Sequence, residues 1–135
     1  MRPEYQLFDR DTQCIVYGFQ TRAVQRMLDF DYVCRRETPS VACMVDPTRS
    51  TLHKVFWGTE GLLVPVYRTM DEAVRRHPGA DVVVNFASAR SAGRTSLEAL
   101  RAETVRTVAV IAEGVPEREA RLLAAEARRL GKWTI

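Results

Sequence analysis

Three segments of this 135-residue chain contain candidate ligand-binding residues, and two of them contain groups that can bind phosphate. The first runs from Gly18 to Arg22 (GFQTR), directly after an apolar run and at the start of a helical pattern. A helix N-terminus offers free amide hydrogens, to which the Thr21 hydroxyl and the Arg22 guanidinium add further donors. Gly18 and Gln20 belong to the same candidate anion site. The alternative interpretation is a plain tight turn, because a single glycine often follows a strand.

The second segment, NFASARS, places Phe86, Ser88 and Arg90 at the end of the clearest apolar strand, and Arg94 follows on the same predicted loop. An aromatic face, a hydroxyl and two cations suit a purine that carries phosphates. A solvated connection between a strand and a helix would have the same composition, so that alternative stays open.

The third segment, IAEGVP, ends another strand with Glu113 and Gly114. Gly114 can adopt a positive φ, and Pro116 suits the first position of the next helix. Glu113 has a simpler alternative role, as an acidic residue that the helix dipole favours.

No catalytic or metal-binding constellation is recognisable. His77 is expected to end a helix as a partly cationic ring, and His53 has no evident partner. The GxGxxG fingerprint lacks its second and third glycines, which are replaced by Gln20 and Ala23, and this argues against NAD. We therefore expect no catalytic residue and no metal ligand in the chain.

Composition narrows the possible partners and the compartment. The net charge of +3 and the pI near 9.0 favour an anionic ligand but do not resemble the basic stripe of a nucleic-acid-binding protein. The first 12 residues lack a secretory signal pattern, and no apolar run approaches the length of a membrane span. Three cysteines without paired spacing indicate a reducing setting, so a cytoplasmic location without membrane contact is expected.

The periodicity predicts alternating strands and helices. Predicted helix starts are Thr21, a cap at Asp71, a cap at Ser96 and Pro116. Strands are expected at 13–17, 40–45, 81–86, 106–112 and from 132, and helices at 21–33, 72–77, 97–103 and 117–130. The residues around 59–61 suggest a small hairpin or a bulge.

This order requires crossover connections and therefore an α/β fold, a Rossmann-like three-layer domain with a mostly parallel sheet. Ligands of such sheets bind outside the carboxyl ends of the strands. The loops after Tyr17, Val45, Phe86 and Ala112 are thus the expected site.

Several runs together resemble the coenzyme A-binding domain of ATP-citrate lyases, within the succinyl-CoA synthetase superfamily. They are YGFQTRAVQRMLDFDYVC, PSVACMV, NFASARSA, RTVAVIAEGVPE and RRLGKWTI, which together extend from about residue 12 to 135. The resemblance implies a single CoA-binding domain over 1–135, with 1–11 as an N-terminal extension, that stops before the family's phosphohistidine domain. Its CoA contacts map onto Gly18, Gln20, Thr21, Arg22, Phe86, Ser88, Arg90, Glu113 and Gly114.

By the same resemblance, the parent enzyme forms acetyl-CoA and oxaloacetate from citrate, CoA and ATP, and it binds ATP and Mg elsewhere. The expected partners are CoA and the remaining domains or subunits, and the segment alone is expected to be inactive. We expect phosphates near Thr21, Arg22 and Arg90, with the adenine against Phe86. Two alternatives stay open: the same domain of a citryl-CoA or succinyl-CoA synthetase, and a free-standing CoA-binding module.

Overall fold

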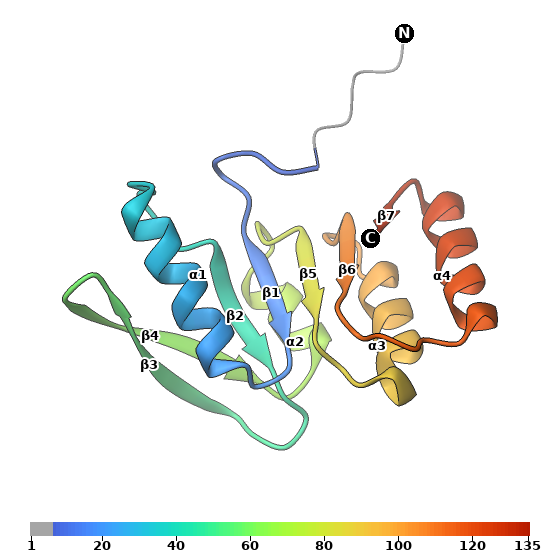
Figure 1. Cartoon of the computed structure of the whole chain (residues 1–135), viewed down its shortest axis with the longest axis horizontal. Coiled ribbons are helices and arrows are strands. Elements are labelled where there is room, and N and C mark those ends of the chain that lie inside the picture. Colours follow the sequence, from blue (N-terminus) through green and yellow to red (C-terminus); the bar gives the residue numbers. More distant parts are fainter. Residues whose placement is uncertain (1–6) are drawn as a thin grey trace, which may run out of the picture.

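A seven-stranded sheet runs through the centre of the computed structural model, which describes residues 7–135 (Figure 1). The strand order is β3-β4-β2-β1-β5-β6-β7, and every neighbouring pair is parallel except the β3–β4 hairpin. The strands are β1 (Cys14–Tyr17), β2 (Val41–Val45), β3 (Thr51–Trp57), β4 (Glu60–Tyr67), β5 (Val82–Asn85), β6 (Thr107–Val110) and β7 (Trp133–Thr134). The predicted Rossmann-like class is confirmed.

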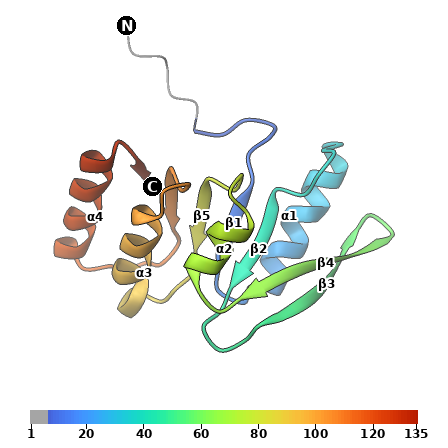
Figure 2. The same ribbon diagram turned by 180° about the vertical axis from the view of Figure 1, so that it is seen from behind.

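Four helices cover the two faces of this sheet: α1 (Thr21–Val33), α2 (Met70–Arg76), α3 (Ala89–Arg101) and α4 (Glu117–Leu130). Helix α1 lies on one face, and the other three lie on the opposite face (Figures 1 and 2). Alternate residues of a strand point to opposite faces, so β1 contributes to two cores. Ile15 packs with residues of α2, α3 and α4, whereas Val16 packs with Val24 and Leu28 of α1.

Helix α3 begins eight residues earlier than predicted. The predicted polar loop ASARSAGRTS is helical from Ala89 onward, with Ser88 at the N-cap, and Ser96 is a fully buried residue within the helix rather than a cap. The composition misled the prediction because two of these polar residues, Thr95 and Ser96, are buried, and their hydroxyls accept hydrogen bonds from the Asn85 side chain of β5. Gly93 occurs where α4 approaches α3 closely, since a Cβ there would lie 2.7 Å from a carboxylate oxygen of Glu119.

Two further helix starts differ from the prediction by one or two residues. Thr69, not Asp71, caps α2, because its hydroxyl accepts a hydrogen bond from the amide of Glu72. Pro116 occupies the N-cap position of α4 instead of its first helical position. Of the predicted hairpin or bulge, the structure forms the hairpin, with its turn at Gly58 and Thr59, whereas Glu60 and Gly61 already belong to β4.

The strand order determines where a ligand can enter. From β1 the chain crosses to β2 on one side, and it later returns to place β5 on the other side of β1. Such a reversal opens a crevice at the carboxyl ends of the two central strands. The loops after β1, β2, β5 and β6 therefore meet at one end of the sheet, the lower end in Figure 1. Within residues 7–135, no helix has the length and apolar composition needed to cross a bilayer.

Candidate functional site at the carboxyl ends of the central strands

The turn between β1 and α1 forms the centre of the site. Gly18 has φ +116°, a conformation that favours glycine, and its amide donates to the carbonyl of Val45 at 2.7 Å. Gln20 occupies the N-cap position of α1 but its side chain does not cap the helix. The first amides of α1 have no carbonyl acceptor within the helix, so they are available to an anion. Arg22 lies in this first turn with an exposed side chain.

The loop after β5 lies directly beside this turn. The amide of Phe86 donates to the carbonyl of Tyr17 at 3.0 Å, which continues the β1–β5 pairing beyond the strand ends. A Cβ added to Gly18 would lie 3.4 Å from the Cβ of Phe86 and 3.5 Å from the Cγ of Gln20. The structure therefore brings together three of the residues that the sequence predicted for the site.

The buried side chain of Asn85 holds the loop in place. Its amide nitrogen donates to the hydroxyls of Thr95 and Ser96, each at 2.8 Å, and its carbonyl oxygen accepts from the amide of Ala87 at 2.9 Å. One side chain thus connects the end of β5, the loop and the second turn of α3. The sequence analysis missed this residue, although a lone asparagine at the end of the apolar run VVV was a usable signal.

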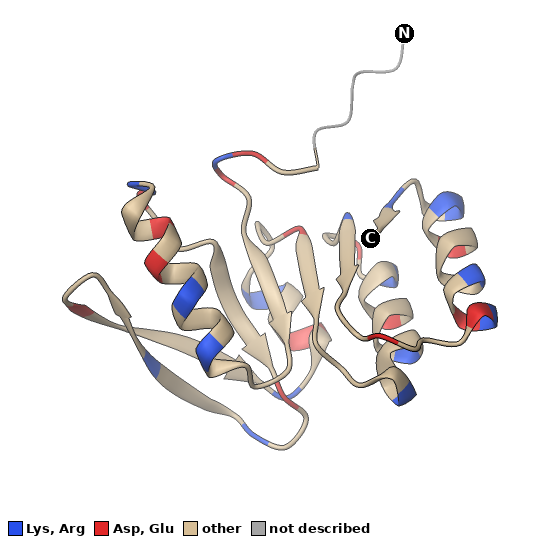
Figure 3. Cartoon of the chain, in the orientation of Figure 1, with Lys and Arg blue, Asp and Glu red and all other residues tan. Residues whose placement is uncertain are grey.

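A second uncapped helix N-terminus faces the crevice from the other side of the sheet. Ser88 occupies the N-cap position of α3 without a side-chain hydrogen bond, and Arg90 is exposed in the first turn. Neither α1 nor α3 has an acidic residue in its first turn. By contrast, α2 and α4 each begin with two acidic residues. In Figure 3, blue ribbon segments near the starts of α1 and α3 mark Lys or Arg residues. The two helices beside the crevice, α1 and α3, are thus the ones whose first turns have no negative side chain to repel an anion.

Glu113 and Gly114 lie one strand further from the centre of the site, in the loop after β6. Gly114 has φ +78°, so the predicted positive φ is confirmed. Both residues are exposed, and a Cβ on Gly114 would meet no atom within 4 Å. They border the same end of the sheet, on the side of β5 away from α1.

A cluster in the loop after β2 was not among the predicted site residues. Asp46 accepts hydrogen bonds from the amide and the hydroxyl of Thr48, at 2.9 and 2.7 Å, and pairs with Arg49 at 3.0 Å. The pKa of Asp46 is lowered, first by these bonds from Thr48 and also by Arg49. The guanidinium of Arg49 lies over the ring of Phe19, 3.9 Å from its centroid. The Asp-x-Thr spacing is typical of such a turn and was the available signal.

Each of the two histidines contacts an aromatic ring. The ring of His53 packs edge-on against Phe19, with centroids 5.4 Å apart. His77 ends α2 as predicted, but the expectation of a partly cationic ring is wrong. Burial lowers the pKa of His77, and its Nε2 shares a hydrogen bond of 2.9 Å with the hydroxyl of Tyr67.

Known proteins match the chain over most of its length. Residues 9–114 match the family model described as the CoA binding domain. The chain is 54% identical over 121 residues to a probable ATP-citrate synthase subunit 1 of Schizosaccharomyces pombe, which covers 89% of this chain and 20% of that protein. It is 51% identical over 126 residues to the ATP-citrate synthase of Homo sapiens, covering 93% of this chain and 11% of that protein.

A solved structure agrees with these sequence matches. The ATP citrate lyase of Methanothrix soehngenii, determined in complex with citrate and coenzyme A, superposes with a TM-score of 0.95 at 55% identity. The match covers 96% of this chain and 21% of that one. The chain therefore spans about a fifth or less of the length of these relatives. Because the family model for the CoA binding domain matches residues 9–114, which is most of the chain, the chain belongs to the family of CoA-binding domains.

Proposed function

We propose that this chain is the CoA-binding domain of an ATP-citrate lyase, the enzyme that forms acetyl-CoA and oxaloacetate from citrate, CoA and ATP. The observation that carries the ligand assignment is the pair of uncapped, acid-free helix N-termini, α1 with Arg22 and α3 with Arg90, on either side of the crevice. CoA contains a diphosphate and a ribose phosphate, and such groups are bound by free helix amides and by guanidinium groups. The similarity to ATP-citrate synthases supports the choice of parent enzyme.

The predicted contacts divide into two groups by position. Thr21 and Arg22 at the start of α1, together with Arg90 at the start of α3, are proposed to bind the phosphates. Gly18, Gln20, Phe86 and Ser88 are proposed to shape the floor of the crevice between them. Glu113 and Gly114 lie after β6, beyond β5, and are proposed to border the far end of an extended CoA molecule.

The remaining parts of the reaction belong to other domains of the parent enzyme. ATP, Mg and citrate are proposed to bind there, and this segment alone is expected to bind CoA without turning citrate over. A cytoplasmic location is proposed because the three cysteines, Cys14, Cys34 and Cys43, are all free thiols, as is usual in a reducing compartment.

Isothermal titration of this chain with CoA, dephospho-CoA and NAD tests the ligand assignment. CoA should bind more tightly than either other ligand, because the ribose phosphate adds a charged contact that the others lack. Arg22→Ala and Arg90→Ala should each weaken CoA binding by about 1–3 kcal/mol, the range for hydrogen bonds to charged groups. Arg35→Ala, at the opposite end of α1, is the matched control and should bind CoA like the wild type.

Tighter binding of NAD than of CoA would remove the ligand assignment. Equal affinities for CoA and dephospho-CoA would show that no guanidinium contacts the ribose phosphate. The parent enzyme is tested separately, by coupling oxaloacetate release to NADH oxidation through malate dehydrogenase. A parent that makes only a stable acyl-CoA would be a synthetase and not a lyase.

A further inference from the structure

We propose that the β3–β4 hairpin is the docking surface for an amphipathic helix from the rest of the parent enzyme. The helix would lie on the hairpin face opposite α1, called the outer face below. This face is formed by Leu52, Lys54, Phe56, Gly61, Leu63 and Pro65. The inference rests on the proposed function, because it requires the chain to be one part of a longer enzyme. The chain spans about a fifth or less of its relatives, so the partner would come from the remaining length.

The pairing of the two strands defines the outer face. Val55 of β3 and Val64 and Val66 of β4 are buried in the same core cluster as Val24 and Leu28 of α1. Alternate residues of a strand point to opposite faces, and paired residues share a face. The residues that alternate with these valines therefore point away from α1.

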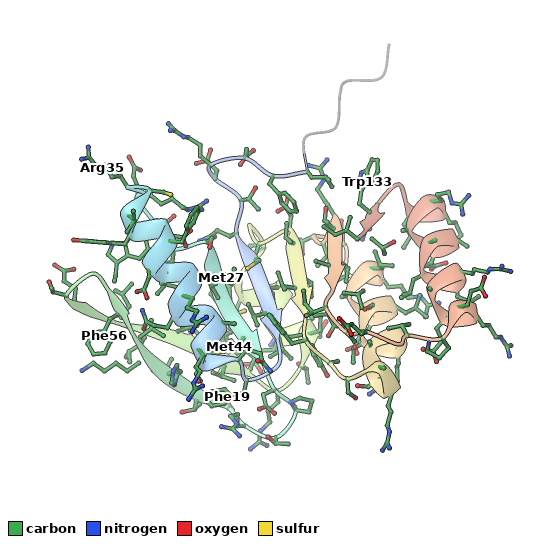
Figure 4. All side chains as sticks on the ribbon, in the orientation of Figure 1. Phe19, Met27, Arg35, Met44, Phe56 and Trp133 are labelled. Carbon is green, nitrogen blue, oxygen red and sulfur yellow. The ribbon has the colours of Figure 1, made fainter. Side chains whose placement is uncertain are left out.

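Three large apolar side chains of the outer face are exposed. Leu52, Phe56 and Leu63 each expose half or more of their surface. Leu63 pairs with Lys54, and Leu52 and Phe56 flank Lys54 along β3, so the three apolar side chains are cross-strand neighbours. Single exposed apolar residues are normal, but a contiguous group marks an interaction site. Figure 4 labels Phe56 on the hairpin, at the end of the molecule opposite α4.

The layer of helices on this side of the sheet ends before the hairpin. Tyr67, the last residue of β4, packs against the core cluster that contains Met70 and Ala73 of α2. Towards the turn, none of the four helices within residues 7–135 lies in front of the hairpin in Figure 2. Sheets of the α/β class normally have helices on both faces. A helix from elsewhere in the parent enzyme would complete this layer.

The edge of β3 favours docking on the face over the addition of a strand. The Gln25 side chain of α1 binds both backbone groups of Phe56. Its Oε1 accepts from the Phe56 amide at 2.9 Å, and its Nε2 donates to the Phe56 carbonyl at 2.8 Å. Backbone groups of an antiparallel strand point alternately to its two sides, so an added strand could pair only with Leu52 and Lys54. Strands usually have about three residues or more, and an edge lysine discourages strand addition.

Lys54 determines the chemistry of the partner. Its ammonium lies 5.5 Å from the centroid of the Phe56 ring, and a Cβ on Gly61 would lie 3.0 Å from its Cε. The side chain thus lies across the apolar group. None of the ion pairs found within residues 7–135 involves Lys54. A cation that a partner covers needs a counter-charge. The docking helix should therefore present an aspartate or glutamate among apolar residues.

Hydroxyl-radical footprinting of the full-length parent enzyme measures whether the outer face is covered. Leu122 of α4 is the matched control, because it is 58% exposed in this domain, compared with 59% for Leu52 and 60% for Leu63. We expect Leu52 and Leu63 to be oxidised several-fold more slowly than Leu122. Lys54→Glu should repel the partner's carboxylate and raise the oxidation of Leu63 to the level of Leu122. Lys54→Arg, which keeps the charge, should leave Leu63 protected.

Carbodiimide cross-linking of the same enzyme identifies the partner, because this reagent joins an ammonium directly to a neighbouring carboxylate. The chain contains only two lysines, Lys54 and Lys132. The Lys132 ammonium already donates to two carbonyl oxygens at 2.6 Å, so Lys132 serves as the internal control. We expect Lys54 to be linked to an aspartate or glutamate outside residues 1–135, in a segment with the apolar spacing of a helix.

Three results would overturn the docking surface. Oxidation of Leu52 and Leu63 as fast as that of Leu122 would show that the outer face is open. Links from Lys54 only to carboxylates of residues 1–135, in the same or a second copy, would exclude the rest of the enzyme as the partner. Unchanged protection of Leu63 in Lys54→Glu would exclude an acidic group opposite Lys54.

The two proposals fail separately, because neither readout involves CoA or citrate. An open outer face in an enzyme that binds CoA and releases oxaloacetate would overturn the docking surface alone. An enzyme that binds no CoA but gives the expected link from Lys54 would refute the proposed function and leave the docking surface intact.

Discussion

Replacing Asn85 with alanine should destabilise the domain more than any ordinary polar substitution, because one buried side chain ties β5, the following loop and α3 together. Asn85 is 1% exposed and makes three hydrogen bonds of 2.9 Å or less. At about 0.5–1.5 kcal/mol for each bond, Asn85→Ala should cost roughly 2–4 kcal/mol. The Thr95 and Ser96 hydroxyls left behind are themselves buried, so the upper part of this range is expected. A loss of this size is a substantial fraction of the 5–15 kcal/mol that stabilises a typical domain.

Urea denaturation followed by circular dichroism measures this loss of stability. Gln13→Ala is the matched control, because its side-chain amide makes a single hydrogen bond, to the carbonyl of Pro39 at 3.2 Å. That control should cost no more than about 1 kcal/mol. Once Asn85 is replaced, removal of the Ser96 hydroxyl should cost little more, since coupled partners are not additive. If Asn85→Ala changed the free energy of unfolding by less than the control, the proposed network would not stabilise the fold.

Three further perturbations test separate parts of the structure. Gly18→Ala should lower the free energy of unfolding by roughly 1–3 kcal/mol, because alanine is strained at φ +116°. A Gly18→Ala variant as stable as the wild type would contradict this expectation. Lys132→Met should lower the stability of the domain by about 1–3 kcal/mol, measured by thermal unfolding, since the Lys132 ammonium donates to two carbonyl oxygens at the end of α3, each at 2.6 Å. An unchanged melting temperature would disprove that role. Because burial lowers the pKa of His77, the neutral ring is favoured in the folded state, and stability should fall as the pH drops from about 7.5 to 5.5, through the ordinary value of about 6.5. His77→Gln should reduce this pH dependence in urea titrations, and an equal slope in both proteins would exclude His77 as its source.

The class of fold and the general location of the site follow from local patterns in the sequence. Short β-branched runs alternate with helical periodicity, and this order allows few arrangements other than a parallel sheet. The confirmed hairpin between β3 and β4 and the positive φ of Gly114 have equally local causes. The carboxyl ends of parallel strands share one end of the sheet, so the loops that contain Gly18 and Phe86 had to meet there.

Tertiary contacts decided the features for which composition was misleading. The run from Ala89 to Ser96 has the composition of a loop, but it is helical, and Asn85 at the end of β5 satisfies its buried hydroxyls, those of Thr95 and Ser96. The contact of the Arg49 guanidinium with the ring of Phe19 joins residues 30 positions apart in sequence, and it depends on how the loop after β2 packs against the α1 turn. Sequence periodicity reports which residues are near in the chain and which face is apolar. Contacts between side chains of separate elements depend on how those elements pack, so the structure alone defines them.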